Sequence, residues 1–193
     1  METVKSKDSV SCSVGWADKT VENNRAPRTH WDFKLYKNKA DFDAGIVQDQ
    51  WESDNIVTNQ GKDALNDIMF HGATQITTWY VLLFSTNTTC VVGMTYAVPV
   101  FTESAVYDEA TRPAYVEAAS SSQSITNTAS RAVFTMNDTA TIYGCGLVGG
   151  GTDGNTKSDT AGGGTLYCAS KFDSAKSVIA TNVLSVGITI TQS

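Results

Sequence analysis

Residues 149–164, GGGTDGNTKSDTAGGG, combine glycines with carboxylate, amide and hydroxyl side chains, which are groups that bind phosphates and cations. Gly149, Gly151 and Gly154 have the spacing of the dinucleotide-binding fingerprint, and an apolar segment precedes them. That fingerprint needs a helix to begin at the last glycine and to receive the pyrophosphate at its amino end. Residues 155–164 contain no large apolar side chain with which such a helix could pack. We therefore predict that the chain binds no cofactor.

Asp153, Asn155 and Asp159 in the same stretch carry the oxygen ligands that Ca²⁺ prefers. Lys157 lies between them, where a calcium loop needs another acceptor, and no glutamate follows at the spacing of a bidentate ligand. The spacing therefore favours a solvated loop over a metal site. We predict a long excursion between two strands, of a length that typically serves contacts or is disordered.

A catalytic serine needs a base, which is usually histidine, and the chain has two histidines. His30 follows a proline-containing connection, and His71 ends a predicted helix, where it can interact with the last carbonyls. Neither adjoins a Gly-x-Ser-x-Gly elbow, a motif that the sequence lacks. We predict no catalytic residues and a protein that is not an enzyme.

Four carboxylates between residues 103 and 117 leave glycoside hydrolysis open, because they could converge in a fold: Glu103, Asp108, Glu109 and Glu117. The segment VYDEATRPAY that contains two of them is more typical of an acidic turn. Its single basic residue, Arg112, predicts a local ion pair.

The four cysteines are widely separated and form no Cys-x-x-Cys pair: Cys12, Cys90, Cys145 and Cys168. This spacing suggests neither a zinc site nor a redox pair. We expect free and mostly buried thiols, because reducing cytosol disfavours disulfides.

The formal net charge of the 193 residues is -6. Binding to nucleic acid phosphates needs clustered Lys and Arg, so we predict no nucleic-acid partner. No apolar run approaches the roughly 20 residues of a membrane helix, and the first ten residues lack the apolar core of a signal peptide. We predict synthesis in the cytoplasm and no membrane association.

Alternation of apolar and polar residues predicts strands over most of the chain. In residues 31–37 it places Trp31, Phe33 and Leu35 on one face, and in residues 182–191 it does the same for Leu184, Val186, Ile188 and Ile190. Further strands are expected at 77–84, 91–101, 114–118, 124–128, 131–136, 140–148 and 164–172.

In one segment the apolar residues recur with the period of a helix. In residues 58–72, Ala64, Leu65, Ile68 and Met69 share a face, with Thr58 or Asn59 as the cap and Gly72 as the terminator. The sequence thus predicts an all-β, antiparallel β-sandwich or jelly-roll-like fold with one short α-helix.

An extended N-terminal arm is predicted to precede this sandwich. Val10, Cys12, Val14 and Trp16 alternate with small residues, and an aperiodic connection follows them. We divide the chain into an arm, residues 1–30, and a β-sandwich domain, residues 31–193. Strands at sheet edges can pair with another chain, so we expect the arm to reach a neighbouring subunit and to bury Val10, Val14 and Trp16 there.

Several longer segments stand out as a series: NIVTNQGKDALNDIMFHG, ITTWYVLLF, TYAVPVFTES, YDEATRPAYVEA, and ATIYGCGLVGGGTDG with SDTAGGGTLYCASKF. Over residues 50–193 this series resembles a set of tailed-bacteriophage virion proteins. In that group a phrase like Asn55-Ile56-Val57-Thr58 with Gly61 begins the single helix, a Trp-Tyr strand follows, and an acidic segment precedes a pair like Arg112-Pro113. None of these motifs carries a catalytic role, and residues 1–50 depart from the pattern.

The resemblance implies a capsid decoration or cement protein, which locks neighbouring major capsid subunits together. Such a protein stays in the host cytoplasm until assembly and then acts on the capsid surface as an oligomer, for example a trimer. Two alternatives remain. One is a tail or fibre-associated structural protein, and the other is a carbohydrate-binding or carbohydrate-hydrolysing module of the virion that uses Trp51, Trp79 or the tyrosines as stacking platforms.

Overall fold

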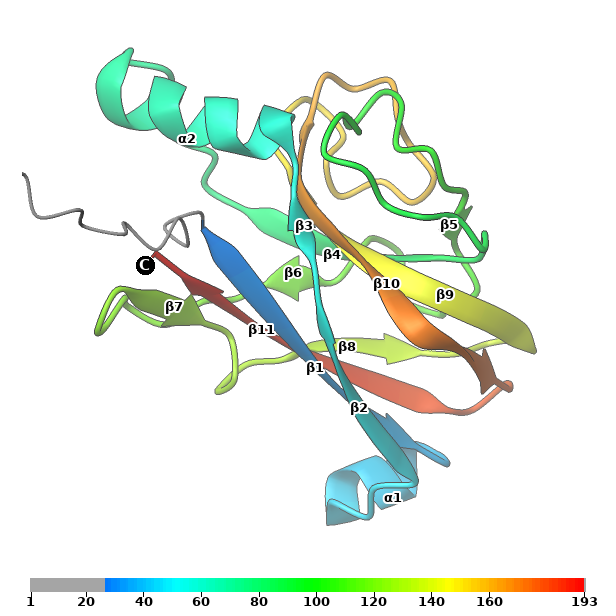
Figure 1. Cartoon of the computed structure of the whole chain (residues 1–193). Helices are drawn as coiled ribbons and strands as arrows, with labels where there is room; N and C mark the ends of the chain where they lie inside the picture. The colour runs from blue at the N-terminus through cyan, green and yellow to red at the C-terminus, as the bar shows by residue number, and fades with distance from the viewer. Residues whose placement is uncertain (1–26, 193) are drawn as a thin grey trace, which may run out of the picture.

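A computed structural model describes residues 27–192, which form two antiparallel β-sheets packed face to face (Figure 1). The predicted all-β sandwich is therefore confirmed. The first sheet contains β2 (Asp49–Asp54), β1 (Arg28–Tyr36) and β11 (Val183–Thr191) in that order, with β7 (Ser124–Thr126) and β8 (Ala132–Thr135) both on the far side of β11. The second contains β3 (Ile56–Val57), β10 (Thr165–Val178), β9 (Ala140–Gly149) and β4 (Trp79–Phe84), with β5 (Glu103–Ser104) and β6 (Ala114–Tyr115) both beside β4.

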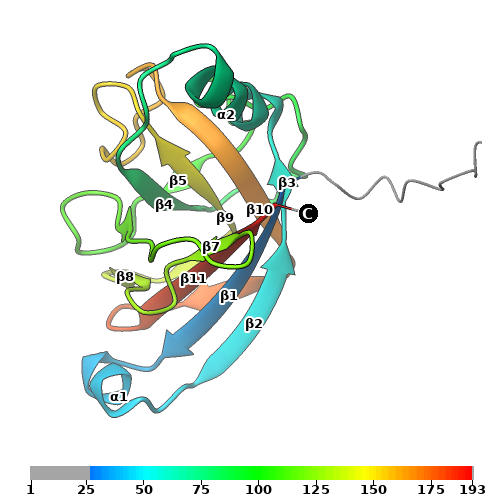
Figure 2. The same ribbon diagram turned by 90° about the vertical axis from the view of Figure 1, so that its left-hand side faces the viewer.

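One extended segment closes a side of the sandwich by passing from sheet to sheet. Only Asn55 separates β2, which pairs with β1, from β3, which pairs with β10 (Figure 2). The hydroxyl oxygens of Ser53 and Ser170 lie 2.5 Å apart across this side. The opposite edges end in strands of two to four residues, which leave little unpaired backbone for another chain.

The predicted contact residues of the N-terminal arm, Val10, Val14 and Trp16, lie outside the described residues. The arm's predicted boundary at residue 30 falls within β1, where Arg28 pairs with Thr191 and His30 with Thr189. The last residues that were assigned to the arm therefore belong to the first sheet.

The prediction of a single helix is wrong, because two helices lie within residues 27–192. The predicted one is α2 (Asn59–Phe70), whose N-cap is Thr58 and whose C-cap is His71. The second is α1 (Lys39–Ala44), which has no buried residue and therefore no apolar periodicity to reveal it. Its only sequence signals were the capping residues Asn38 and Gly45. Neither helix is long and apolar enough to cross a membrane.

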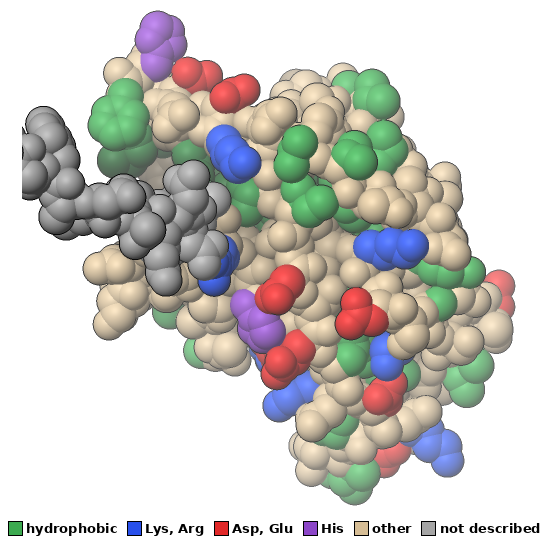
Figure 3. Space-filling view, viewed as in Figure 1, with side chains coloured by type: hydrophobic (Ala, Val, Ile, Leu, Met, Phe, Trp, Pro, Cys, Tyr) green, Lys and Arg blue, Asp and Glu red, His purple; other side chains and the backbone are tan. Residues whose placement is uncertain are grey.

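The strand predicted for residues 91–101 is also wrong, because this segment belongs to a long loop between β4 and β5. Buried side chains do not alternate here: Met94 and Tyr96 are buried, but the next buried residue is Phe101. Pro99 lacks a backbone donor, and Val100 has a φ of 58°, which no strand allows. Hydrophobic side chains consequently gather on the surface over this loop (Figure 3).

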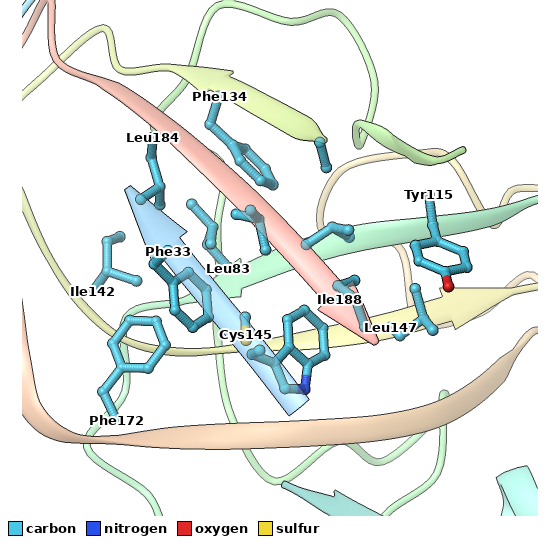
Figure 4. Packing of buried hydrophobic residues seen from close by; sticks show 14 of the residues in the cluster. Phe33, Leu83, Tyr115, Phe134, Ile142, Cys145, Leu147, Phe172, Leu184 and Ile188 are labelled. Carbon is cyan, nitrogen blue, oxygen red and sulfur yellow. The ribbon is translucent and has the colours of Figure 1, made fainter. Parts of the chain in front are cut away.

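The core lies between the two sheets and is rich in aromatic rings (Figure 4). The predicted inward faces of β1 and β11 are confirmed, since Trp31, Phe33, Leu184 and Ile188 are all buried. The Phe33 ring meets the Phe172 ring edge to face across the core, with their centroids 4.8 Å apart. These contacts bind β1 of the first sheet to β10 of the second.

Gly144 of β9 shows how tightly the second sheet packs. A Cβ at this position would lie 2.1 Å from Cζ of Phe84 and 2.2 Å from the carbonyl oxygen of Ser170. We expect Gly144→Ala to lower the free energy of unfolding by about 1–3 kcal/mol, as overpacking does. Gly93→Ala is the control, because a Cβ there meets nothing within 4 Å. Equal midpoints in urea for the two variants would contradict this packing.

Candidate functional site

Two long loops lie against each other at one end of the sandwich: residues 85–102, between β4 and β5, and residues 150–164, between β9 and β10 (Figure 1). The second is the glycine-rich segment, and it is indeed an excursion between two strands. It folds back on itself, since the Thr152 amide donates to the Gly162 carbonyl at 2.9 Å. The side chain that joins the two loops belongs to a third segment, between β5 and β6.

Arg112 is the buried centre of this end of the molecule, with 2% of its surface exposed. Nε and Nη2 donate to the two carboxylate oxygens of Glu103 at 2.9 and 2.6 Å. The remaining donors reach the carbonyls of Gly154 and Asp159, both at 2.9 Å, and the Tyr96 hydroxyl at 3.2 Å. A guanidinium has five N–H donors, so all are used within the protein. Arg112 therefore joins both loops and offers no free donor to an anionic ligand.

Arg112 forms an ion pair, as predicted, but its partner is Glu103 on β5, nine residues away and outside the acidic turn. Burial by itself lowers the pKa of Arg112, but the hydrogen bonds to Glu103 and its negative charge outweigh burial and raise that pKa above its usual range. The Glu103 carboxylate also accepts from the Ser158 amide at 2.9 Å. The pair is thus charged, buried and bonded to the glycine-rich loop.

The remaining candidates for carboxylate chemistry have separate surroundings. The Glu109 carboxylate accepts from the Thr135 amide at 3.0 and 3.1 Å, and Asp108 and Glu117 are exposed. In residues 27–192 no three His, Cys, Asp or Glu side chains are grouped so as to hold a metal ion. Glu103 and Glu109 therefore satisfy backbone and arginine donors.

The residues considered above as calcium ligands instead make hydrogen bonds that shape the glycine-rich loop. The Asn155 carbonyl accepts from the Arg112 amide at 2.8 Å, and the Asp159 carboxylate accepts from the Ala161 amide at 2.9 Å. Lys157 points inward, where Nζ donates to the Tyr107 carbonyl at 2.8 Å and lies 4.0 Å from the centroid of the Tyr107 ring. The loop is therefore hydrogen-bonded to the body of the protein. The prediction of a solvated loop was wrong in this respect.

The two histidines lie in different places on the surface. His30 is exposed on β1, with Nδ1 3.3 Å from Asp54 and Nε2 3.7 Å from Glu52. His71 ends α2, where its amide donates to the Asp67 carbonyl at 3.0 Å, as a capping residue does. Within the described part of the chain, neither hydrogen-bonds a serine or a cysteine.

The thiols of Cys90, Cys145 and Cys168 are free and buried, as predicted, while Cys12 lies outside the described residues. Burial disfavours the thiolate and raises the pKa of Cys90 to about 11 and that of Cys168 to about 12. Thiolates are the nucleophilic form of cysteine, so these side chains are unreactive near neutral pH.

Exposed apolar side chains gather in two places, on the first of the two long loops and at the end of α2. Val91, Val92, Val98 and Val100 are exposed on the loop of residues 85–102. Met69 and Phe70 at the end of α2 are 69% and 85% exposed. Sequence reasoning missed both groups, because it placed the valines in a strand and Met69 on the packed face of the helix. The available signal was that residues 68–102 contain no Asp, Glu, Lys or Arg.

A cavity of about 230 Å³ opens between the two loops. Apolar side chains form most of its wall, and they come from β4, β9, β10 and the first loop: Leu82, Pro99, Phe101, Val148 and Leu166. Ser158 and Thr160 are exposed at its rim. The site therefore combines an apolar cavity with exposed apolar side chains beside it.

No known protein-family model matches the chain, and no curated protein is significantly similar to it in sequence.

Proposed function

We propose that this protein is a structural component of a bacteriophage virion, a decoration or cement protein that binds major capsid subunits and catalyses no reaction. The observation that carries the proposal is a pair of exposed, charge-free apolar surfaces, one formed by residues 68–70 and the other by residues 91–100. The cores of protein interfaces are poor in charge, and exposed apolar patches mark sites of protein contact. The segments that resemble virion proteins include residues 68–70 of the first surface and residues 95–100 of the second.

The bonding of Arg112 supports a role in adhesion. Binding costs less when loops already have their bound conformation, because less conformational entropy is lost. Arg112 and Glu103 hold the carbonyls of Gly154 and Asp159 and the amide of Ser158, so the loop beside the exposed valines is ordered before any contact. Arg112 and Glu103 would be the leading candidates for catalysis at this end of the molecule if their side chains were not already bonded within the protein.

The aromatic residues favour protein contact over the carbohydrate alternative. Trp51 packs against Phe33 and Phe172, at ring-centroid distances of 5.1 and 5.5 Å, and Trp79 meets Tyr167 edge to face. A stacking platform for sugars needs a free ring face. These rings already have protein partners.

Imaging of phage particles tests the proposal. We expect copies of the protein at fixed positions on the capsid surface, and we expect it to co-purify with heads that lack tails. Density for the protein on the tail alone would instead identify a tail component. A chain that begins at Pro27 keeps β1 intact, so its occupancy on heads, compared with that of the full chain, measures whether the arm contributes to binding.

A further inference from the structure

We propose that copies of this protein associate head to tail, with Phe70 of one copy inserted in the cavity between residues 85–102 and 150–164 of the next. The inference rests on the proposed function for its biological role, because it names the contact by which a decoration protein forms its oligomer. Its test needs only the purified protein.

The end of α2 has the form of a rigid apolar projection. The first turn of the helix is fixed to β10: the Thr58 hydroxyl donates to the Leu166 carbonyl at 2.5 Å, and a Cβ on Gly61 would lie 2.5 Å from the Tyr167 carbonyl oxygen. The last turn extends beyond the sheet (Figures 1 and 2) and carries Met69 and Phe70 in solvent. An aromatic side chain on a fixed helix loses little entropy on binding and is typical of interface hot spots.

The cavity has the size and the lining for one aromatic ring. A dry apolar cavity of about 150 Å³ binds benzene, so a hollow of about 230 Å³ accepts a phenyl ring together with its methylene. The floor is apolar, and the charged groups in its wall are already paired: Arg112 has no unused donor, Glu103 accepts from Arg112 and Ser158, and the Asp159 carboxylate accepts from the Ala161 amide and the Tyr96 hydroxyl. A neutral ring therefore enters without leaving a buried charge unsatisfied, whereas an anion finds no unpaired cation in the wall.

The two surfaces lie on different sides of the molecule, which suits a second copy as the occupant. Figure 1 places the free end of α2 at the left and the loops around the cavity at the right, and Figure 2 agrees, since the helix end faces the viewer. A contact between unlike surfaces of identical chains can repeat around a closed ring.

Charge also favours contact at these two surfaces. Each copy has a formal net charge of -6, so copies repel one another and must meet where charge is lowest. Met69, Phe70, Val98 and Pro99 all belong to residues 68–102, which carry no formal charge. Added salt should therefore strengthen the association by screening the repulsion between the remaining charges.

A stable contact needs more surface than the Phe70 ring alone provides, and neighbouring exposed residues can supply it. A standard interface buries about 800 Å² on each partner, and one aromatic side chain supplies roughly 150–250 Å² of it. Met69 and the exposed residues 71–75 extend the surface on the helix side. Val98 and Val100 flank Pro99 at the cavity and extend the other side.

Sedimentation velocity of the purified full chain over a wide concentration range tests the inference. Phe70→Ser removes the ring, Thr160→Trp fills the cavity mouth from its exposed rim, and Ile179→Ser removes an exposed apolar side chain elsewhere. We expect oligomers of the unaltered chain, self-association weakened about tenfold or more by either of the first two changes, and no effect of the third. Equal melting temperatures of the dilute variants would show that each is folded.

Mixing the two weakened variants distinguishes unlike from like contacts. Phe70→Ser keeps an open cavity and Thr160→Trp keeps the ring, so the mixture should form a 1:1 complex that neither variant forms alone. A monomeric unaltered chain at all concentrations, an unchanged Phe70→Ser oligomer, or no complex in the mixture would each overturn the inference. Capsid binding by a monomeric protein would leave the proposed function intact, and assembly without capsid binding would leave the inference intact.

Discussion

Replacement of Arg112 by methionine is expected to lower the free energy of unfolding by about 3–5 kcal/mol, because removing one partner of a buried ion pair leaves the other charge without compensation. Glu103 is that partner, with 7% of its side chain exposed. The change also frees the carbonyls of Gly154 and Asp159, which adds to the loss. Chemical unfolding followed by circular dichroism measures the effect.

Lys39→Met is the matched control, since it removes a cation from the exposed ion pair with Asp43 on α1. Exposed pairs contribute only about 0–1 kcal/mol, so this variant should stay close to the unaltered chain. A second replacement, Glu103→Met in the Arg112→Met background, should recover part of the loss, because it removes the unpaired charge. If Arg112→Met and Lys39→Met lost the same amount, the buried pair would not hold the loops.

Truncation of Phe33 to alanine is expected to cost about 3–5 kcal/mol, as large-to-small changes of buried aromatic residues do. The ring contacts Trp31, Trp51 and Phe172, which come from both sheets. Its loss leaves a cavity that those rings can fill only in part. Thermal or urea unfolding measures the change.

Phe42→Ala on α1 provides the comparison for Phe33. Its ring is half-buried and meets the Tyr36 ring, at a centroid distance of 5.1 Å, and the Lys39 ammonium, 5.4 Å from its centroid. The smaller buried area predicts a clearly smaller loss of stability, since the cost follows the apolar surface returned to water. A loss for Phe42→Ala as large as that for Phe33→Ala would show that the core does not dominate stability.

Together these variants separate two contributions to the same fold. Phe33 reports on the contact between the sheets, and Arg112 reports on the loops at one end. Domain stabilities are typically about 5–15 kcal/mol, so either change removes a large share of the total. An Arg112→Met protein that remains folded should also bind its partner less tightly, because its loops must be ordered on contact.

The strands and α2 could be predicted because their signals are local. In β1, apolar residues recur at every second position, and burial follows that period. In β11 the same period selects the face that meets the core, although the first six residues are buried on both faces. Thr58 caps α2 through its own side chain, which accepts from the Gly61 amide at 2.9 Å. Where the local signal was weak, prediction failed: α1 buries nothing, and residues 91–101 have strand-forming valines without a strand's alternation.

The candidate site depended on the tertiary structure. From the sequence alone, Arg112 predicted an ion pair, but Glu103, Tyr96, Gly154 and Asp159 are brought to it by the pairing of β4 with β5 and β9. Contacts between such distant residues leave no periodic trace in the chain. The sequence by itself thus determined which faces of the strands are buried, because alternation is a property of neighbouring residues. Only the folded chain decided which loops meet, where the cavity lies and which apolar side chains stay in solvent, because these follow from the arrangement of whole strands.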